Sequence, residues 1–185
     1  MFLSKSKVFL SLTKARLSFS VVFSTLAGYV LAVDLVNFSD LVLLLIGGYC
    51  MVGASNSFNQ IIEKDKDALM DRTKKRPLPT KEISISNAFW ISVLLTIAGL
   101  SILYTINYKT AFFAAVSVFI YTCIYTPLKP ITPLSVFVGA IPGAIPFMLG
   151  WVAATNSFGI EPGTLFMIQF FLAISSLLGI GMDAG

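Results

Sequence analysis

The chain has 185 residues, of which 56% are hydrophobic and only 12% charged, and its mean hydropathy is +0.86. Soluble domains carry about 25% charged residues, so this composition excludes a disordered chain and indicates a membrane protein. The sequence contains no histidine. Histidine-based metal sites and Ser-His or Cys-His catalysis are therefore excluded for these residues.

Six apolar segments are long enough, or nearly so, to cross a bilayer, which takes about 20 mostly apolar residues. They cover residues 17–33, 41–62, 88–108, 111–126, 134–154 and 165–180. The fourth is predicted to end at Thr126, because Pro127 disfavours helix for the residue before it. In the fifth, Gly139 and Gly143 predict a close approach to a neighbouring helix. The sequence thus predicts an all-α fold, a single polytopic transmembrane bundle over residues 1–185.

Basic residues mark one side of this bundle. The N-terminal arm holds four of the 13 Lys and Arg residues, the 63–87 loop holds seven, and the loop after the fourth span holds one, Lys129. The loops on the other side hold only Lys109. Because basic loops stay in the cytoplasm, we expect a multi-pass protein of the cytoplasmic (inner) membrane, with its N-terminus and its 63–87 loop inside the cell.

Oxygen-bearing side chains recur at every fourth residue where the second span leaves the membrane, forming an acidic stripe of Asn59, Glu63, Asp67 and Asp71. On a helix each step of four drifts by only about 40°, so the first three lie on one face within about 12 Å. Carboxylates this close repel each other unless a cation lies between them. Oxygen ligands with room for water suit Mg²⁺, which usually takes one or two carboxylates together with substrate phosphates.

A basic cluster follows at once, formed by Arg72, Lys74, Lys75 and Arg76. Because Arg binds phosphate oxygens in pairs, the stripe and the cluster together indicate recognition of a Mg²⁺-diphosphate. The alternative is a solvated cytoplasmic loop whose charges set topology and pair along the helix. Asn59 favours a functional site, since polar groups near membrane depth are costly and usually serve function.

A second group of polar residues follows the fourth span on the same side of the membrane. Tyr121, Tyr125 and Lys129 are spaced by four, although Pro127 argues against one continuous helix across them. An interfacial aromatic belt with a snorkelling lysine explains the same pattern without any catalytic role.

Two sets of motifs resemble a known family. The run Asn59-x-x-x-Glu63-x-x-x-Asp67, followed by Asp71-Arg72-Thr73-x-x-Arg76-Pro77-Leu78, resembles the first acidic motif of the UbiA-type intramembrane prenyltransferases. Segments 125–133, 139–146 and 150–155 are similar to the second block of that family. The resemblance covers roughly residues 5–171 and is strongest to the branch that farnesylates protohaem.

This resemblance implies a larger helical bundle that binds farnesyl diphosphate through Mg²⁺. It also implies transfer of the farnesyl group to a vinyl of haem b, giving haem O. Carried over by position, the metal-binding residues are Asn59, Glu63, Asp67 and Asp71, and the catalytic residues are Glu63 and Asp67. The diphosphate-binding residues are Arg72, Lys75, Arg76, Lys129 and Tyr125.

The resemblance sets the expected partners as well. They are farnesyl diphosphate and haem b as substrates, the lipid bilayer, and haem-handling or oxidase-assembly proteins; we expect no nucleic acid. Two alternatives stay open: a prenyltransferase that acts on another acceptor such as a quinone precursor, and an inactive membrane fragment. The Arg-Thr-x-x-Arg-Pro-Leu run favours haem as acceptor.

The segment 172–185 shows no resemblance to the family, and the Trp-Gln-x-Pro-His segment due at this place is missing. Back-translation with chosen synonymous codons, omitting one T after the Phe171 codon, reads Trp-Gln-Phe-Pro-His-Tyr-Trp. We therefore expect a C-terminally truncated chain with a frameshifted tail and no activity of its own. Sequencing the gene across the Phe171 codon tests this, because a gene without a run of T there would contradict it.

Overall fold

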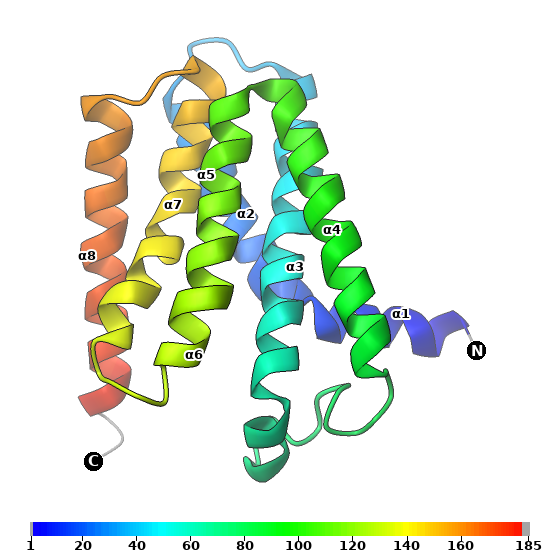
Figure 1. Ribbon diagram of the computed structural model, residues 1–185. Coiled ribbons are helices and arrows are strands. Elements are labelled where there is room, and N and C mark those ends of the chain that lie inside the picture. Colours follow the sequence, from blue (N-terminus) through cyan, green and yellow to red (C-terminus); the bar gives the residue numbers. More distant parts are fainter. Residues whose placement is uncertain (1, 183–185) are drawn as a thin grey trace.

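The computed structural model describes residues 2–182, and within them it contains helices and connecting turns but no strand (Figure 1). Residues 183–185 of the predicted frameshifted tail lie outside this range. The helices are α1 (Phe2–Leu12), α2 (Ala15–Leu31), α3 (Phe38–Leu69), α4 (Ile85–Ile106), α5 (Tyr108–Phe119), the π-helical η1 (Ile120–Tyr125), α6 (Thr126–Leu128), α7 (Ser135–Thr155) and α8 (Ile160–Met182).

The six predicted spans correspond to α2, α3, α4, the run α5–η1–α6, α7 and α8, which confirms the all-α polytopic membrane fold. Four of these helices are long and apolar enough to cross a membrane: α3, α4, Tyr108–Leu128 and α7. Helix α2 and the Ile160–Ser176 part of α8 are shorter apolar helices. Helix α8 continues across Phe171, so the start of the predicted tail is not a helix boundary.

Helix α3 is longer than a bilayer requires, which places the acidic stripe outside the hydrocarbon. Its 32 residues span about 48 Å, against about 30 Å for the hydrocarbon core. Asn37 caps its first turn by accepting a hydrogen bond from the Ser39 amide. Helix α3 continues beyond the predicted span of 41–62 to Leu69, as the stripe on one helical face requires, and Glu63, Lys64 and Lys66 extend it as good helix formers.

The helical path also continues past Pro127, contrary to the predicted end at Thr126. The chain widens into the π-helical turn η1, in which the Thr126 amide bonds to the Tyr121 carbonyl five residues earlier. Proline normally clashes with the carbonyl four residues before it, and the wider turn accommodates the ring. The Lys129 amide then bonds to the Tyr125 carbonyl at 2.9 Å, so Tyr121, Tyr125 and Lys129 share one helical segment.

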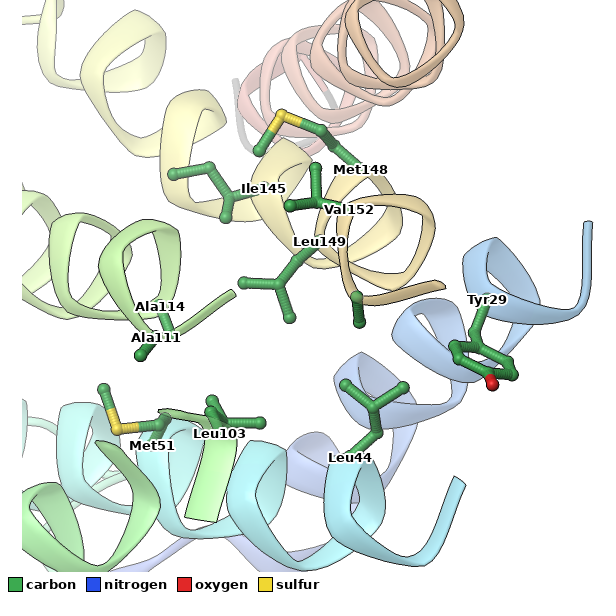
Figure 2. Packing of buried hydrophobic residues seen from close by; sticks show 11 residues of the cluster. Tyr29, Leu44, Met51, Leu103, Ala111, Ala114, Ile145, Met148, Leu149 and Val152 are labelled. Atoms are coloured by element: carbon green, nitrogen blue, oxygen red, sulfur yellow. The ribbon is translucent and has the colours of Figure 1, made fainter. Parts of the chain in front are cut away.

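The main hydrophobic core lies between α2, α3, α4, α5 and α7. In Figure 2, Leu149 of α7 points into the space between the helices, and Met51 of α3 and Leu103 of α4 lie on the opposite side of that space. Among the glycines of the described residues, Gly28 and Gly150 leave the least room for a side chain, because they lie where α2 and α7 cross. Of the two glycines predicted to allow close approach, Gly139 contacts the Tyr125 ring, whereas Gly143 has room for a methyl group.

Candidate active site

The last turns of α3 carry Asn59, Glu63 and Asp67 along one face. All three are largely shielded from solvent: Asn59 is 3% exposed, and the side chains of Glu63 and Asp67 are 13% and 4% exposed. Burying carboxylates is costly unless they are paired. The structure therefore has to supply cations to this face.

Two basic side chains from different segments supply them. The Arg76 guanidinium lies 2.6 Å from a carboxylate oxygen of Asp67, and the Lys129 ammonium lies 3.2 Å from one of Glu63. Only one oxygen of each carboxylate takes part in these ion pairs. The arrangement concentrates two negative and two positive groups at one end of the bundle, with Lys129 still half-exposed.

The 70–81 segment folds back so that Arg76 reaches Asp67. Thr73 donates from its hydroxyl to the Asp67 carbonyl at 3.0 Å, which ties the segment to the end of α3. Pro77 and Leu78 are buried, and Leu78 packs with Leu12 and Ala88 in a second apolar cluster. The Arg-Pro-Leu sequence thus has a structural reason: its apolar residues anchor the turn that presents Arg76.

Asn59 connects α3 to two other segments. Its amide nitrogen donates to the Thr126 hydroxyl at 3.2 Å, and that hydroxyl donates to the Tyr121 carbonyl at 2.7 Å. Its amide oxygen accepts from the Lys14 ammonium at 3.2 Å. The sequence predicts neither partner, because Lys14 belongs to a run of basic residues that sets topology and Thr126 lies at the predicted end of a span.

Lys14 owes its position to an unusual turn between α1 and α2. Its backbone is left-handed, with φ 48° and ψ 56°, a conformation that costs energy for a residue with a side chain. Gln60 holds the turn by donating to the carbonyls of Ser11 and Leu12 at 3.1 and 2.8 Å. Asn56 donates to the Thr13 carbonyl at 3.3 Å, so two side chains of α3 clamp the turn from one side.

The surroundings of Lys14 perturb its ionisation. Burial, aided by the positive charge of Arg76, lowers the pKa of the Lys14 ammonium to about 8. The carboxylates of Glu63 and Asp67 act in the opposite direction. Three cations, Lys14, Arg76 and Lys129, therefore lie near the same two carboxylates. Lys14 is recognised only in the folded structure, because its place in the sequence does not indicate this contact.

Comparison with known proteins decides the family. The pattern that describes the UbiA prenyltransferase family matches residues 21–181 of this chain. The chain belongs to the UbiA prenyltransferase family. That match includes residues 172–181, which form most of the segment expected to be frameshifted.

Curated relatives and solved structures agree with this assignment. The protoheme IX farnesyltransferases of Flavobacterium psychrophilum and Christiangramia forsetii are 63% and 62% identical to 94% of this chain. The chain spans 59% and 58% of their lengths. A digeranylgeranylglyceryl phosphate synthase superposes with a TM-score of 0.82 at 20% identity, covering 92% of this chain and 60% of that one. A UbiA homologue of Archaeoglobus fulgidus bound to GPP and Mg²⁺ superposes at 0.73, with 21% identity and coverage of 92% and 61%.

Some of the predicted site residues of this UbiA chain lie apart from the buried face. Asp71 is exposed and pairs with Lys74 instead of joining Asn59, Glu63 and Asp67. Arg72 and Lys75 are exposed, and neither forms an ion pair within residues 5–176, whose side chains are described. The helix ends at Leu69, so the four-residue period no longer applies to Asp71.

Tyr125 lies between the site and α7. Its ring is 5.4 Å from the Tyr121 ring, and it fills the space over Gly139, where a β-carbon would come within 2.5 Å of it. Only a glycine at this position of α7 leaves room for the ring. Tyr125 thus packs at the edge of the site, in the same helical segment as Lys129.

Oxygen donors at the site fit a hard cation that also binds phosphate. Within the described part of the chain, no group of three Asp, Glu, His or Cys side chains is close enough to hold a metal ion alone. Mg²⁺ needs only one or two carboxylates when a diphosphate provides further oxygens. Glu63, Asp67 and the Asn59 amide form such a partial set.

An apolar chamber lies beside this charged face. Two cavities of about 150 and 50 Å³ share the lining residues Val21, Val52, Ser55, Ser117 and Pro146. The larger one is also lined by Asn56 and Tyr121, about one helical turn from Asn59 and Thr126. The site therefore combines charged groups at the end of the bundle with an apolar interior.

Proposed function

We propose that this protein transfers the farnesyl group of farnesyl diphosphate to a vinyl group of protohaem, giving haem O. The observation that carries the proposal is the 60–63% identity to three proteins named protoheme IX farnesyltransferase. The arrangement of the charged groups supports it, since a diphosphate needs cations at one end of an apolar chamber that takes its hydrocarbon chain.

In this proposal Arg76 and Lys129 bind the diphosphate oxygens, and Arg72 and Lys75 add positive charge at the entrance. Both ion-paired cations are held near the acidic residues before the substrate arrives. Their charge opposes the negative charge that grows on the diphosphate as the bond from carbon 1 to oxygen breaks. Because Arg76 and Lys129 are already held at the site by their ion pairs, fewer charged groups have to move when the carbon–oxygen bond breaks.

Asn59, Glu63 and Asp67 would hold Mg²⁺ together with the diphosphate, with Asp71 a more distant acidic group. A bound Mg²⁺ would supply charge neutralisation that makes the diphosphate a better leaving group. The Asn59 oxygen accepts from Lys14 and keeps a second lone pair, so a cation bound there would lie beside the Lys14 ammonium and would favour its turning toward the diphosphate.

The apolar chamber would keep water away from carbon 1 of the farnesyl group. When the carbon–oxygen bond breaks, its electron pair leaves with the diphosphate. The π pair of the haem vinyl then forms the new carbon–carbon bond, and water adds to the resulting cation beside the porphyrin, releasing one proton. Glu63 and Asp67 lie further along α3 than Asn56, which lines the chamber, and in this proposal they would stabilise positive charge at that end of it.

The direct test uses membranes containing the protein expressed from its complete gene, with Mg²⁺, labelled farnesyl diphosphate and either haem b or an aromatic quinone precursor. We expect label in a haem product that has gained a farnesyl group and a hydroxyl. Label in the quinone precursor alone would assign the other acceptor. No transfer to either acceptor, with farnesyl diphosphate bound, would contradict the proposal.

Lys14 should contribute to binding of the diphosphate. We expect Lys14→Met to weaken binding of farnesyl diphosphate by about tenfold to 100-fold, because a hydrogen bond to a charged group contributes roughly 1.5–3 kcal/mol. Lys14→Arg should retain most of the affinity. Equilibrium binding with labelled farnesyl diphosphate measures both. Arg16→Met removes an exposed charge two residues away and is the matched control; an equal loss in this control would refute a specific role for Lys14.

The proposal places the site on the cytoplasmic face of the cytoplasmic membrane, where haem-handling or oxidase-assembly proteins have access to it. In the structure, the loop after α3 and the segment after α6 lie at the same end of the bundle, and the start of α5 lies at the other (Figure 1). A reporter fused after Lys81 should therefore read cytoplasmic, and one after Lys109 should read external. The reverse pattern would overturn this orientation.

A further inference from the structure

A groove lies between α1 and the beginning of α4, apart from the candidate active site. Its volume is about 690 Å³, within the range of roughly 300–1,000 Å³ that is usual for ligand pockets. Figure 1 shows α1 lying crosswise to the bundle, near the first turns of α4. We call this space the α1–α4 groove; its lining residues on α1 are Lys5, Val8 and Phe9, and those on α4 are Asn87, Trp90, Ile91 and Leu94.

Each wall of the α1–α4 groove is one face of a helix, because the lining residues recur at intervals of three and four. On its inner side, the lining residues Ile83 and Ile91 pack against the buried cluster of Leu12, Leu78 and Ala88. The outer side is open: Trp90 and Leu94 are 60% and 64% exposed. The groove is thus closed toward the protein and open toward the bilayer that surrounds α4.

Polarity changes along the groove in the way that it changes across a membrane surface. The charged residues Lys5 and Glu82 line it together with Ser84 and Asn87, which lie at or before the first turn of α4. Trp90 lies one turn deeper, and Leu94 one turn deeper again. Tryptophan is favoured at the level of lipid head groups, with apolar residues beyond it.

We propose that the α1–α4 groove binds a zwitterionic aminophospholipid of the phosphatidylethanolamine class. Lys5 would meet the phosphate, Glu82 would meet the primary ammonium, and an acyl chain would follow Trp90 and Leu94. The single positive and single negative side chain match the two charges of such a head group. In such a lipid the ammonium lies farther from the acyl chains than the phosphate does. Glu82 lies before the start of α4, on the side away from Trp90 and Leu94, and so is placed to meet the ammonium.

The same charge balance argues against other ligands. A diphosphate or a haem propionate pair carries several negative charges and would meet Glu82 unfavourably. An anionic phospholipid would use Lys5 but leave Glu82 without a partner. A choline head group has no N–H to donate, so the carboxylate of Glu82 favours a primary ammonium over a quaternary one.

Quenching of Trp90 fluorescence tests the proposal. The protein is reconstituted in phosphatidylcholine bilayers that contain a minor fraction of lipid with brominated acyl chains, which quench a tryptophan in contact with them. The signal of Trp90 is the part of the fluorescence that Trp90→Phe removes. We expect that brominated phosphatidylethanolamine reaches half-maximal quenching of Trp90 at a mole fraction about fivefold lower than brominated phosphatidylcholine does.

Variants assign the preference to the two charges. Glu82→Gln should abolish the preference for phosphatidylethanolamine, and Lys5→Gln should weaken quenching by both lipids. Lys7→Gln on α1 and Glu161→Gln on α8 change the same charges outside the groove and should preserve the preference. Equal quenching by the two lipids in the unmodified protein would overturn the proposal. Stronger quenching by brominated phosphatidylglycerol, or a preference that survives Glu82→Gln, would overturn it as well.

Discussion

Replacing Asp67 by Asn should abolish Mg²⁺-dependent binding of farnesyl diphosphate, weakening it by about 100-fold or more. Asp67 is the most deeply buried carboxylate of the site, and its ion pair with Arg76 at 2.6 Å holds the cation beside it. An amide of the same shape keeps the packing but removes the charge that both Arg76 and Mg²⁺ require. Titration of labelled farnesyl diphosphate with and without Mg²⁺ measures the loss.

Two controls separate the loss of the carboxylate from a disturbed loop. Asp65→Asn removes an exposed acid two residues away, whose side chain is 88% exposed, and should leave binding unchanged. Thr73→Val breaks the hydrogen bond that ties the 70–81 segment to the Asp67 carbonyl, without removing any charge. If Thr73→Val lost as much affinity as Asp67→Asn, or if Asp67→Asn bound normally, the assignment of Asp67 to the site would be wrong.

The sequence predicts the common face of Asn59, Glu63 and Asp67 because these three residues lie on one helix. A period of four residues places Asn59, Glu63 and Asp67 on one face whenever the helix continues. The same rule fails at Asp71, because α3 ends at Leu69 and the chain turns. Helix propensity alone does not locate that end, since the stop depends on how Thr73 and the Arg-Pro-Leu run fold back.

The basic part of the site is less predictable because it comes from three segments. Arg76 and Lys129 stand out as part of motifs, but Lys14 lies 45 residues from the asparagine that it contacts. Its place depends on a left-handed turn and on hydrogen bonds from Gln60 and Asn56, which no local pattern indicates. Long-range polar contacts of this kind require the fold.

The positions at which helices approach each other closely are also hard to predict from the sequence. A pair of small residues four apart predicts a close approach, and Gly139 and Gly143 are such a pair. Among the glycines that the structure describes, the tightest surroundings are instead those of Gly28 and Gly150, which lie on two helices that are distant in sequence. Each glycine has to match one on the partner helix, and a single sequence does not reveal which positions meet.

The crossing of α2 and α7 should be the position most sensitive to added volume. A β-carbon at Gly150 would lie 1.9 Å from the Thr25 carbonyl oxygen and 2.5 Å from the Tyr29 amide nitrogen. Both are backbone atoms, so the helices must separate. We expect Gly150→Ala to destabilise the bundle by about 3 kcal/mol, the upper end of the usual cost of overpacking. Reversible unfolding in detergent, followed by circular dichroism, measures the change.

Glycine-to-alanine substitutions should not destabilise the bundle where the added methyl group meets open space. A β-carbon at Gly143 would lie 3.8 Å from the nearest atom, a methyl of Ala173, and one at Gly163 would have no neighbour within 4 Å. Alanine is a better helix former than glycine by about 1 kcal/mol, so Gly143→Ala and Gly163→Ala should be neutral or stabilising. Equal stability changes at Gly150 and Gly163 would show that helix propensity, rather than the close approach of α2 and α7, controls the effect.

Gly28→Ala should destabilise as Gly150→Ala does, because its β-carbon would lie 2.0 Å from the Phe147 carbonyl oxygen on the other side of the same crossing.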